Sequence, residues 1–186
     1  MQTVSRQTDI FDDRATFDIK EIAHALSLIC RFNGHTIRHY SVAEHSLLVA
    51  SEIERCGHSV EAQLAGLLHD VAEAYIGDFV SPLKYQMSIG GVSVEWFEKD
   101  LRTRILSSLG LKDFFSDRSY ADIVDMADVA LLQAELRDLF APSRNSKRAR
   151  CRVPKDKPCW TMEVEFQFFG EYKRLTRECR RMRSCK

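Results

Sequence analysis

Residues 65–78 read AGLLHDVAEAYIGD, and the interpretation of the whole chain starts from this stretch. Its periodicity predicts a helix on which Glu73 lies one turn from both His69 and Asp70. Adjacent histidine and aspartate side chains offer nitrogen and oxygen ligands that suit zinc, manganese or cobalt. A solvated doublet on a helix surface is the simpler alternative, but four apolar residues flank the doublet at helical spacing: Leu64, Leu67, Leu68 and Val71. They predict burial, and buried charges need a partner or a metal ion.

The composition is that of a globular protein. Of the 186 residues, 45% are hydrophobic and 29% charged, which excludes overall disorder and allows one domain with a real core. The N-terminus is polar, and no apolar run approaches the roughly 20 residues that a bilayer requires. We therefore expect a soluble, cytoplasmic protein. The six cysteines form no C-x-x-C pair, and their irregular spacing favours reduced thiols over a disulfide framework or a zinc ribbon.

A net charge of zero conceals two segments of opposite sign. Residues 1–140 carry 13 Lys and Arg against 22 Asp and Glu, whereas residues 141–186 carry 14 against 5. A basic C-terminal segment can indicate nucleic-acid binding. It can equally pair with the acidic body, within or between subunits, and attract anionic substrates. We favour the second interpretation, because residues 144–157 lack the interleaved aromatic residues that stack on bases.

Capping residues and apolar periodicity predict a mainly helical chain. Asp18 and Ser41 each stand three residues before a glutamate, which is the pattern of a capping box. The expected helices cover about 18–30, 41–56, 59–77, 94–109, 121–140 and 164–182. We therefore expect an all-α bundle of about six or seven helices. It forms a single domain, 1–186, with a core at about 9–140 and a basic loop and C-terminal helix at 141–186.

Two further positions on other helices are candidate metal ligands. His45 lies in the first turn of its helix, where the helix dipole disfavours protonation and keeps the imidazole neutral for a metal. Asp125 and Asp128 lie one turn apart on the helix at 121–140, and either can face the core. With a metal held between them, Glu73 is the natural general base for an attacking water.

Two segments offer groups for an anionic ligand. Arg31 and Phe32 end the first helix, where they could hold a phosphate and stack on a base, or where the cation simply pairs with the helix dipole. Lys84 follows a proline and could reach an anion beside the metal, although a solvated surface lysine is the commoner case. Gly90 and Gly91 predict a mobile loop after it.

These residues stand in motifs that resemble one family. The chain is similar to the HD-domain metal-dependent phosphohydrolases, and among them to phage-type nucleotide phosphohydrolases, including the dATP triphosphohydrolases of phages that replace adenine with 2-aminoadenine. The similarity covers about residues 9–140. It lies in Ala23–Ser27, Arg31-Phe32-x-Gly34, Tyr40–Ser46, Leu67–Asp70, Glu73-Ala74-Tyr75-x-Gly77-Asp78, Ser81–Lys84 and Ala127-Asp128.

The resemblance implies a role for each matching residue. A divalent ion (zinc, cobalt, manganese or magnesium) would be held by His45, His69, Asp70 and Asp128. Glu73 would position or deprotonate the attacking water, and Arg31 and Lys84 would bind phosphate. Phe32 stands where many relatives have a tryptophan stacked on the base, and Asp78 would lie on the sugar side. Together His69, Asp70 and Glu73 would form the catalytic group.

The resemblance also implies a reaction. We expect hydrolysis of a deoxynucleoside triphosphate, dATP first, to the deoxynucleoside and triphosphate. The alternative is a 5'-deoxynucleotidase that releases phosphate from monophosphates with the same ligands. A nucleotide-sensing or nucleic-acid-binding module without turnover is a hypothesis from another class. The expected partners are a small deoxynucleotide and further copies of the chain, as a dimer or hexamer, in the cytoplasm of a phage-infected bacterium.

Overall fold

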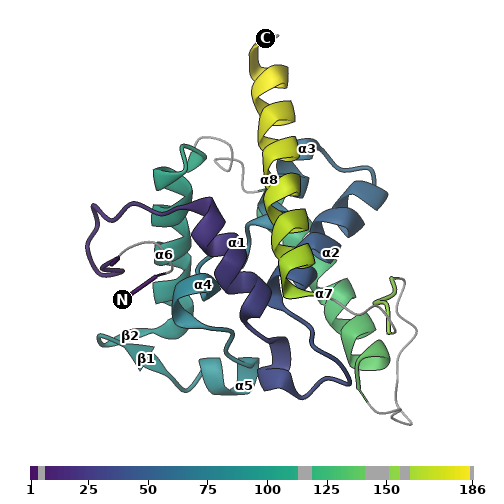
Figure 1. The fold of residues 1–186 in the computed structure, drawn as a ribbon, viewed down its shortest axis with the longest axis horizontal. Helices are drawn as coiled ribbons and strands as arrows, with labels where there is room; N and C mark the ends of the chain where they lie inside the picture. Colours follow the sequence, from purple (N-terminus) through teal and green to yellow (C-terminus); the bar gives the residue numbers. More distant parts are fainter. Residues whose placement is uncertain (4–6, 113–118, 141–150, 156–159, 185–186) are drawn as a thin grey trace.

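The computed structural model describes residues 1–3, 7–112, 119–140, 151–155 and 160–184. Within these residues it is mostly helical, with a single two-stranded hairpin, which confirms the predicted all-α class (Figure 1). In chain order the elements are α1 (Ile19–Leu28), the 3-10 helix η1 (Arg31–Gly34), α2 (Val42–Arg55), α3 (Val60–Leu67), α4 (Glu73–Ile76), α5 (Ser81–Lys84), β1 (Ser88–Ile89), β2 (Val92–Ser93), α6 (Val94–Ser108), α7 (Ser119–Asp138) and α8 (Thr161–Ser184).

Local sequence signals explain where most helices begin. The Asp18 carboxylate accepts a hydrogen bond from the amide of Lys20, and the hydroxyl of Ser41 accepts one from the amide of Glu44. Ser59 and Ser93 cap α3 and α6 in the same way. The helices predicted at 41–56, 94–109 and 121–140 are confirmed to within a few residues. The last helix is longer than predicted, because it begins at Thr161.

The prediction of one continuous helix over residues 59–77 is wrong. α3 ends at Leu67, residues 68–72 form turns, and a single helical turn, α4, follows. The physical reason lies in a side chain. Nδ1 of His69 lies 2.7 Å from the carbonyl oxygen of Gly66, the acceptor that the amide of Asp70 would use in an unbroken helix. His69 and Asp70 therefore lie in a turn between two helices and not on a helix face.

Two other predictions need correction or lie outside the described residues. Gly90 and Gly91 form the turn of a small hairpin in which Ser88 pairs with Ser93 and Ile89 with Val92, not an irregular loop. Of the basic loop at 143–158 only residues 151–155 are described, and Cys159 and Cys185 also lie outside the described residues. No helix in the described part of the chain is long and apolar enough to cross a membrane.

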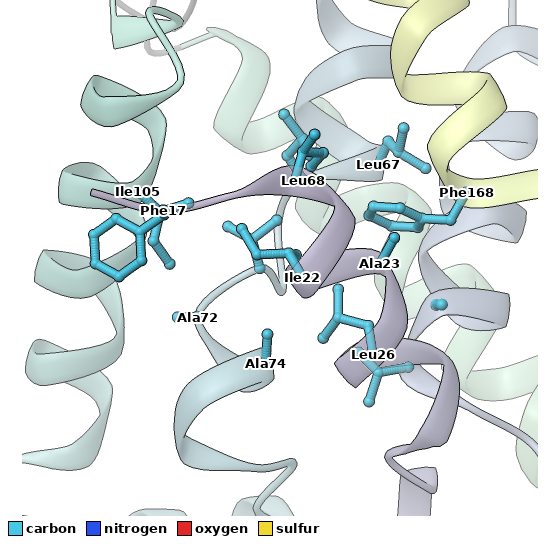
Figure 2. Close-up of a cluster of buried hydrophobic side chains, with 14 of the residues drawn as sticks. Phe17, Ile22, Ala23, Leu26, Leu67, Leu68, Ala72, Ala74, Ile105 and Phe168 are labelled. Atoms are coloured by element: carbon cyan, nitrogen blue, oxygen red, sulfur yellow. The ribbon is translucent and has the colours of Figure 1, made fainter. Parts of the chain in front are cut away.

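Apolar packing joins the helices around α1 and α3. Figure 2 shows Ile22, Leu26 and Phe168 converging between α1 and α8, while Phe17 and Ile105 meet on the α6 side. Leu67 and Leu68 close this core from the end of α3, and both are almost fully buried. At fully buried positions of this kind, truncation of a large side chain costs about 2–5 kcal/mol. Packing of Leu67 and Leu68 in the core thus fixes the start of the turn at residues 68–72.

α2 and α3 approach each other unusually closely. An added Cβ on Gly66 would lie 2.5 Å from Cδ1 of Ile53 and 3.2 Å from Cγ1 of Val49, both on α2. Only glycine fits at this contact without displacing a buried neighbour. Because Gly66 also accepts the bond from His69, the close contact sets the distance between the start of the His-Asp turn and α2.

Candidate metal centre

Three side chains from two parts of the chain meet at one point. Ligand atoms of His45, His69 and Asp70 all lie within 4.8 Å of one another. The carboxylate oxygen Oδ2 of Asp70 is 3.0 Å from Nε2 of His69 and 3.8 Å from Nε2 of His45. His45 comes from the first turn of α2, and the other two come from the turn after α3. The break in the predicted third helix therefore brings the doublet to His45.

Asp128 joins this cluster from α7. Its Oδ1 lies 3.0 Å from Nε2 of His45, and its side chain is 40% exposed, so this side of the cluster is open to solvent. Asp125, the other candidate on the same helix, is exposed and lies on the wall of a separate cavity beside His69. The geometry therefore favours Asp128 as the fourth ligand.

Both imidazoles are held so that Nε2 points to the cluster. Nδ1 of His45 bonds to Oε1 of Glu135 at 2.5 Å, and Nδ1 of His69 bonds to the Gly66 carbonyl. With these acceptors at Nδ1, each ring carries its proton there and has an unprotonated Nε2 available in the neutral state. Both Nε2 atoms are buried and have no hydrogen-bond partner among the described residues. Two such imidazole nitrogens beside two carboxylates fit a divalent ion.

Glu135 organises the side of the cluster that faces the core. This fully buried carboxylate also accepts a hydrogen bond from the hydroxyl of Tyr40 at 2.7 Å and one from Nη2 of Arg31 at 3.4 Å. Carboxylates that orient ligand histidines in this way are common in metal sites. Glu135 is not among the site residues expected from the sequence. Its spacing from Leu131 and Leu139, four residues away on each side, is the signal that places it on the inner face of α7.

Opposite charges shift the pKa values in this network. Burial and Arg31 lower the pKa of His45, but the carboxylates of Glu135 and Asp128 outweigh them and raise it to about 9. Burial would raise the pKa of Asp70, but His69, His45 and Arg31 hold it far below its usual range. The carboxylates around His45 thus favour a positive charge at this point. A metal ion would take the place of the proton on His45.

Arg31, Phe32 and Asp78 lie together beside the metal ligands. Nη1 of Arg31 is 3.6 Å from Oδ2 of Asp70, and its guanidinium lies 5.3 Å from the centre of the Phe32 ring. Although burial would lower it, Glu135 and Asp70 raise the pKa of Arg31 above its ordinary value. Burial raises the pKa of Asp78, which accepts a hydrogen bond from the backbone of Phe32. Nε of Arg31 is buried without a hydrogen-bond partner among the described residues, as expected of a group that awaits an anion.

Phe32 is held in an unusual backbone conformation. It has φ 53° and Asn33 has φ 52°, both in the left-handed region that side chains with a Cβ seldom occupy. Its ring meets the ring of Phe140 edge to face at 5.2 Å between centroids. Strained residues of this kind concentrate at binding sites.

Glu73 and Lys84 meet a residue that sequence reasoning missed. Carboxylate oxygens of Asp70, Glu73 and Glu98 lie within 4.8 Å of one another, and the ammonium of Lys84 contacts Glu98. Burial, followed by the charges of Asp70 and Asp78, raises the pKa of Glu73 well above its usual range. Lys84 is therefore neither solvated nor unpaired. No local pattern identifies Glu98, because it lies on α6, beyond the hairpin.

The segment that contains the cluster is similar to known proteins. The HD domain profile matches residues 42–139, which contain His45, His69, Asp70, Asp128 and Glu135. An uncharacterized protein of Rhodobacter capsulatus is 38% identical over 95 residues, 48% of each chain. The uncharacterized protein YfdR of Escherichia coli is 34% identical over 121 residues, which is 65% of this chain and 60% of YfdR. The chain thus spans about half to three fifths of the length of these relatives.

Proposed function

The chain belongs to the HD-domain family of metal-dependent phosphohydrolases, and from this premise we propose that it hydrolyses a deoxynucleotide, with dATP converted to deoxyadenosine and triphosphate. The observation that carries the proposal is the pair of buried Nε2 atoms of His45 and His69, which lie 3.0 Å from carboxylate oxygens of Asp128 and Asp70 and make no other contact of this kind among the described residues except that of His45 with Asp70. A divalent ion bound there lowers the pKa of water and offsets charge on a phosphoryl group. The imidazole ligands suit zinc or cobalt and the carboxylates suit manganese or magnesium, so we propose one of these four ions.

The side chains around the cluster supply the other requirements of the reaction. Water attacks the α-phosphorus, the bond from phosphorus to the 5'-oxygen breaks, and that oxygen leaves with a proton as the sugar hydroxyl. Glu73, a buried carboxyl with a raised pKa, is suited to accept the proton of the attacking water. The Arg31 guanidinium would neutralise phosphate oxygens. Phe32 would stack on the base, and Asp78 would bind on the sugar side, since both lie against Arg31.

A 5'-deoxynucleotidase that releases phosphate from monophosphates is the second candidate. The same four ligands and the same general base serve both reactions, so the alternative rests on the metal cluster as well. Both reactions break the bond from the α-phosphorus to the 5'-oxygen, and they differ only in how much of the phosphate chain the protein holds. We also propose that the protein works in the cytoplasm as a homo-oligomer, a dimer or hexamer, which analytical ultracentrifugation tests.

The test is an incubation of the metal-loaded protein with each of the four dNTPs and dNMPs, with nucleoside, phosphate, pyrophosphate and triphosphate resolved. From dATP we expect triphosphate and deoxyadenosine. The Asp70→Ala variant should release neither product, because it lacks the carboxylate that lies near Nε2 of both histidines. Glu163→Gln is the control, because Glu163 is an exposed carboxylate in the first turn of α8, outside the cluster and its cavities. Phosphate from dAMP without triphosphate from dATP would move the protein to the second candidate.

A further inference from the structure

The cavity beside His69 borders the metal centre. It has a volume of about 810 Å³ and lies between the end of α3, α6 and the start of α7. His69 lines it from the metal side, Lys99 and Arg102 line it from α6, and Tyr120 and Asp125 from α7. His69 is thus the residue that the cavity and the metal centre have in common. The roles proposed above for the site residues do not use it.

The two cations on the α6 wall, Lys99 and Arg102, differ in their ion pairs from the two cations beside the metal cluster. Arg102 is anchored by a hydrogen bond of 3.1 Å from Nη1 to the backbone oxygen of His69. Neither Arg102 nor Lys99 has an ion pair within the described residues, and they lie one turn apart on the same helix face. In contrast, Arg31 shares its charge with Asp70 and Glu135, and Lys84 with Glu98. The α6 pair thus has donors left for a ligand.

Charge around the metal centre makes these donors necessary for a long anion. Five carboxylates surround the cluster, Asp70, Asp78, Glu98, Asp128 and Glu135, besides Glu73, whose raised pKa favours its neutral form, against two cations, Arg31 and Lys84. A divalent ion offsets only part of this excess. One phosphate at the metal is compatible with it, but a chain of three phosphates needs further positive charge where its distal groups lie.

We propose that this cavity is the subsite for the phosphates beyond the one held at the metal centre, with Arg102 and Lys99 as their ligands. The proposal rests on the proposed function and deepens it, because it selects a triphosphate over a monophosphate as the substrate. Asp122 and Asp125 on the α7 wall repel an anion, so the phosphate chain lies along α6. A monophosphate does not reach these residues and does not depend on them.

Calorimetric titration of the metal-loaded full chain with inorganic triphosphate and with inorganic phosphate tests the subsite. For Lys99→Gln/Arg102→Gln we expect the Kd for triphosphate to rise about 10- to 100-fold, because two charge-assisted contacts are lost, and the Kd for phosphate to stay within about twofold. Arg102→Lys should recover part of the loss. Arg181→Gln, which removes an exposed charge near the end of α8, is the matched control and should bind both anions as wild type does.

Two readouts keep the result interpretable. Metal affinity reports whether loss of the Arg102 bond disturbs His69, and Lys99→Gln alone repeats the test at an exposed residue that makes no such bond. An unchanged Kd for triphosphate, or an equal loss for phosphate and triphosphate, overturns the subsite. If the variants weaken triphosphate binding but wild type releases none from dATP, the subsite stands and the proposed reaction fails. If dATP is hydrolysed and the variants bind triphosphate normally, the reaction stands and the subsite fails.

Discussion

Glu135 and Asp138 lie three residues apart on α7, and each accepts bonds from several partners, yet their surroundings differ. Glu135 is fully buried, and its partners His45, Tyr40 and Arg31 are buried or nearly so. Asp138 pairs with Arg137 and with Lys155, whose side chain is 54% exposed, and it accepts a bond of 3.1 Å from the backbone of Val153. The network around Glu135 orients the candidate metal ligand His45, and the network around Asp138 holds residues 151–155 against α7.

Asp138 is itself only 6% exposed, so the difference shows that the burial of the partners, and not the number of bonds, decides what a carboxylate contributes. Removing one partner of a buried ion network leaves the other charges without water or counter-charge, at a cost of about 3–5 kcal/mol. Exposed ion pairs contribute about 0–1 kcal/mol, since solvent screens them. Glu135 should therefore govern both stability and metal binding, whereas Asp138 should affect stability slightly and metal binding not at all.

The largest effect is expected at Glu135. Glu135→Leu should lower the free energy of unfolding by about 3–5 kcal/mol in urea denaturation, because His45 and Arg31 lose their shared counter-charge. Glu135→Gln keeps the shape and can still accept from Tyr40, so it should fold and show metal affinity reduced about 10- to 100-fold by titration.

Glu95→Gln, at an exposed position in the first turn of α6, is the control and should match wild type in both measurements. Wild-type metal affinity in Glu135→Gln would contradict the contrast drawn between the two carboxylates.

An intermediate effect is expected at Gly66, which supports the second histidine by packing and a backbone bond and not by charge. Gly66→Ala should destabilise the protein by about 1–3 kcal/mol, partly offset by better helix propensity, because the new Cβ meets Ile53. Ile53→Val in the same chain removes Cδ1 and should restore part of the loss. Chemical denaturation of the two single variants and the double variant gives the coupling, and simple additivity would speak against the clash.

The smallest effect is expected at Asp138, and it should depend on pH. Arg137 holds the pKa of Asp138 below its ordinary value even though burial opposes this. The unfolded chain therefore binds the proton more readily, so the stabilisation is present above about pH 4 and is lost as the pH falls through the folded pKa. Asp138→Asn should cost at most about 1 kcal/mol at pH 7, and the difference from wild type should vanish near pH 2. A difference that is equally large at both pH values would contradict this origin.

Helix positions could be predicted from sequence because their signals are local. The serine at position 41 and the apolar spacing behind it need no partner from elsewhere in the chain, and α2 begins where they indicate. The end of α3 could not be predicted, because a side chain competes with the helix for the Gly66 carbonyl. Helix propensity does not reveal that the His69 side chain competes for this carbonyl.

The candidate site could be predicted only where a residue type is diagnostic by itself. His45, His69 and Asp70 were candidates by chemistry, and they meet in space. Glu135 lies 90 residues from the histidine that it bonds, and Glu98 pairs with Lys84 across a hairpin, so neither contact leaves a local pattern. Lys84, which was expected either to be a solvated surface lysine or to reach an anion beside the metal, contacts Glu98.

The break after Leu67 matters for any attempt to transplant this site into a designed bundle. Neighbouring residues on an unbroken helix point about 100° apart, so the side chains of an adjacent histidine and aspartate on it diverge. Here the turn brings Nε2 of His69 and Oδ2 of Asp70 to 3.0 Å. An ideal designed helix that carried only the adjacent histidine and aspartate would present two separate surface groups. The interruption, with the glycine that anchors it, is the part that must be copied.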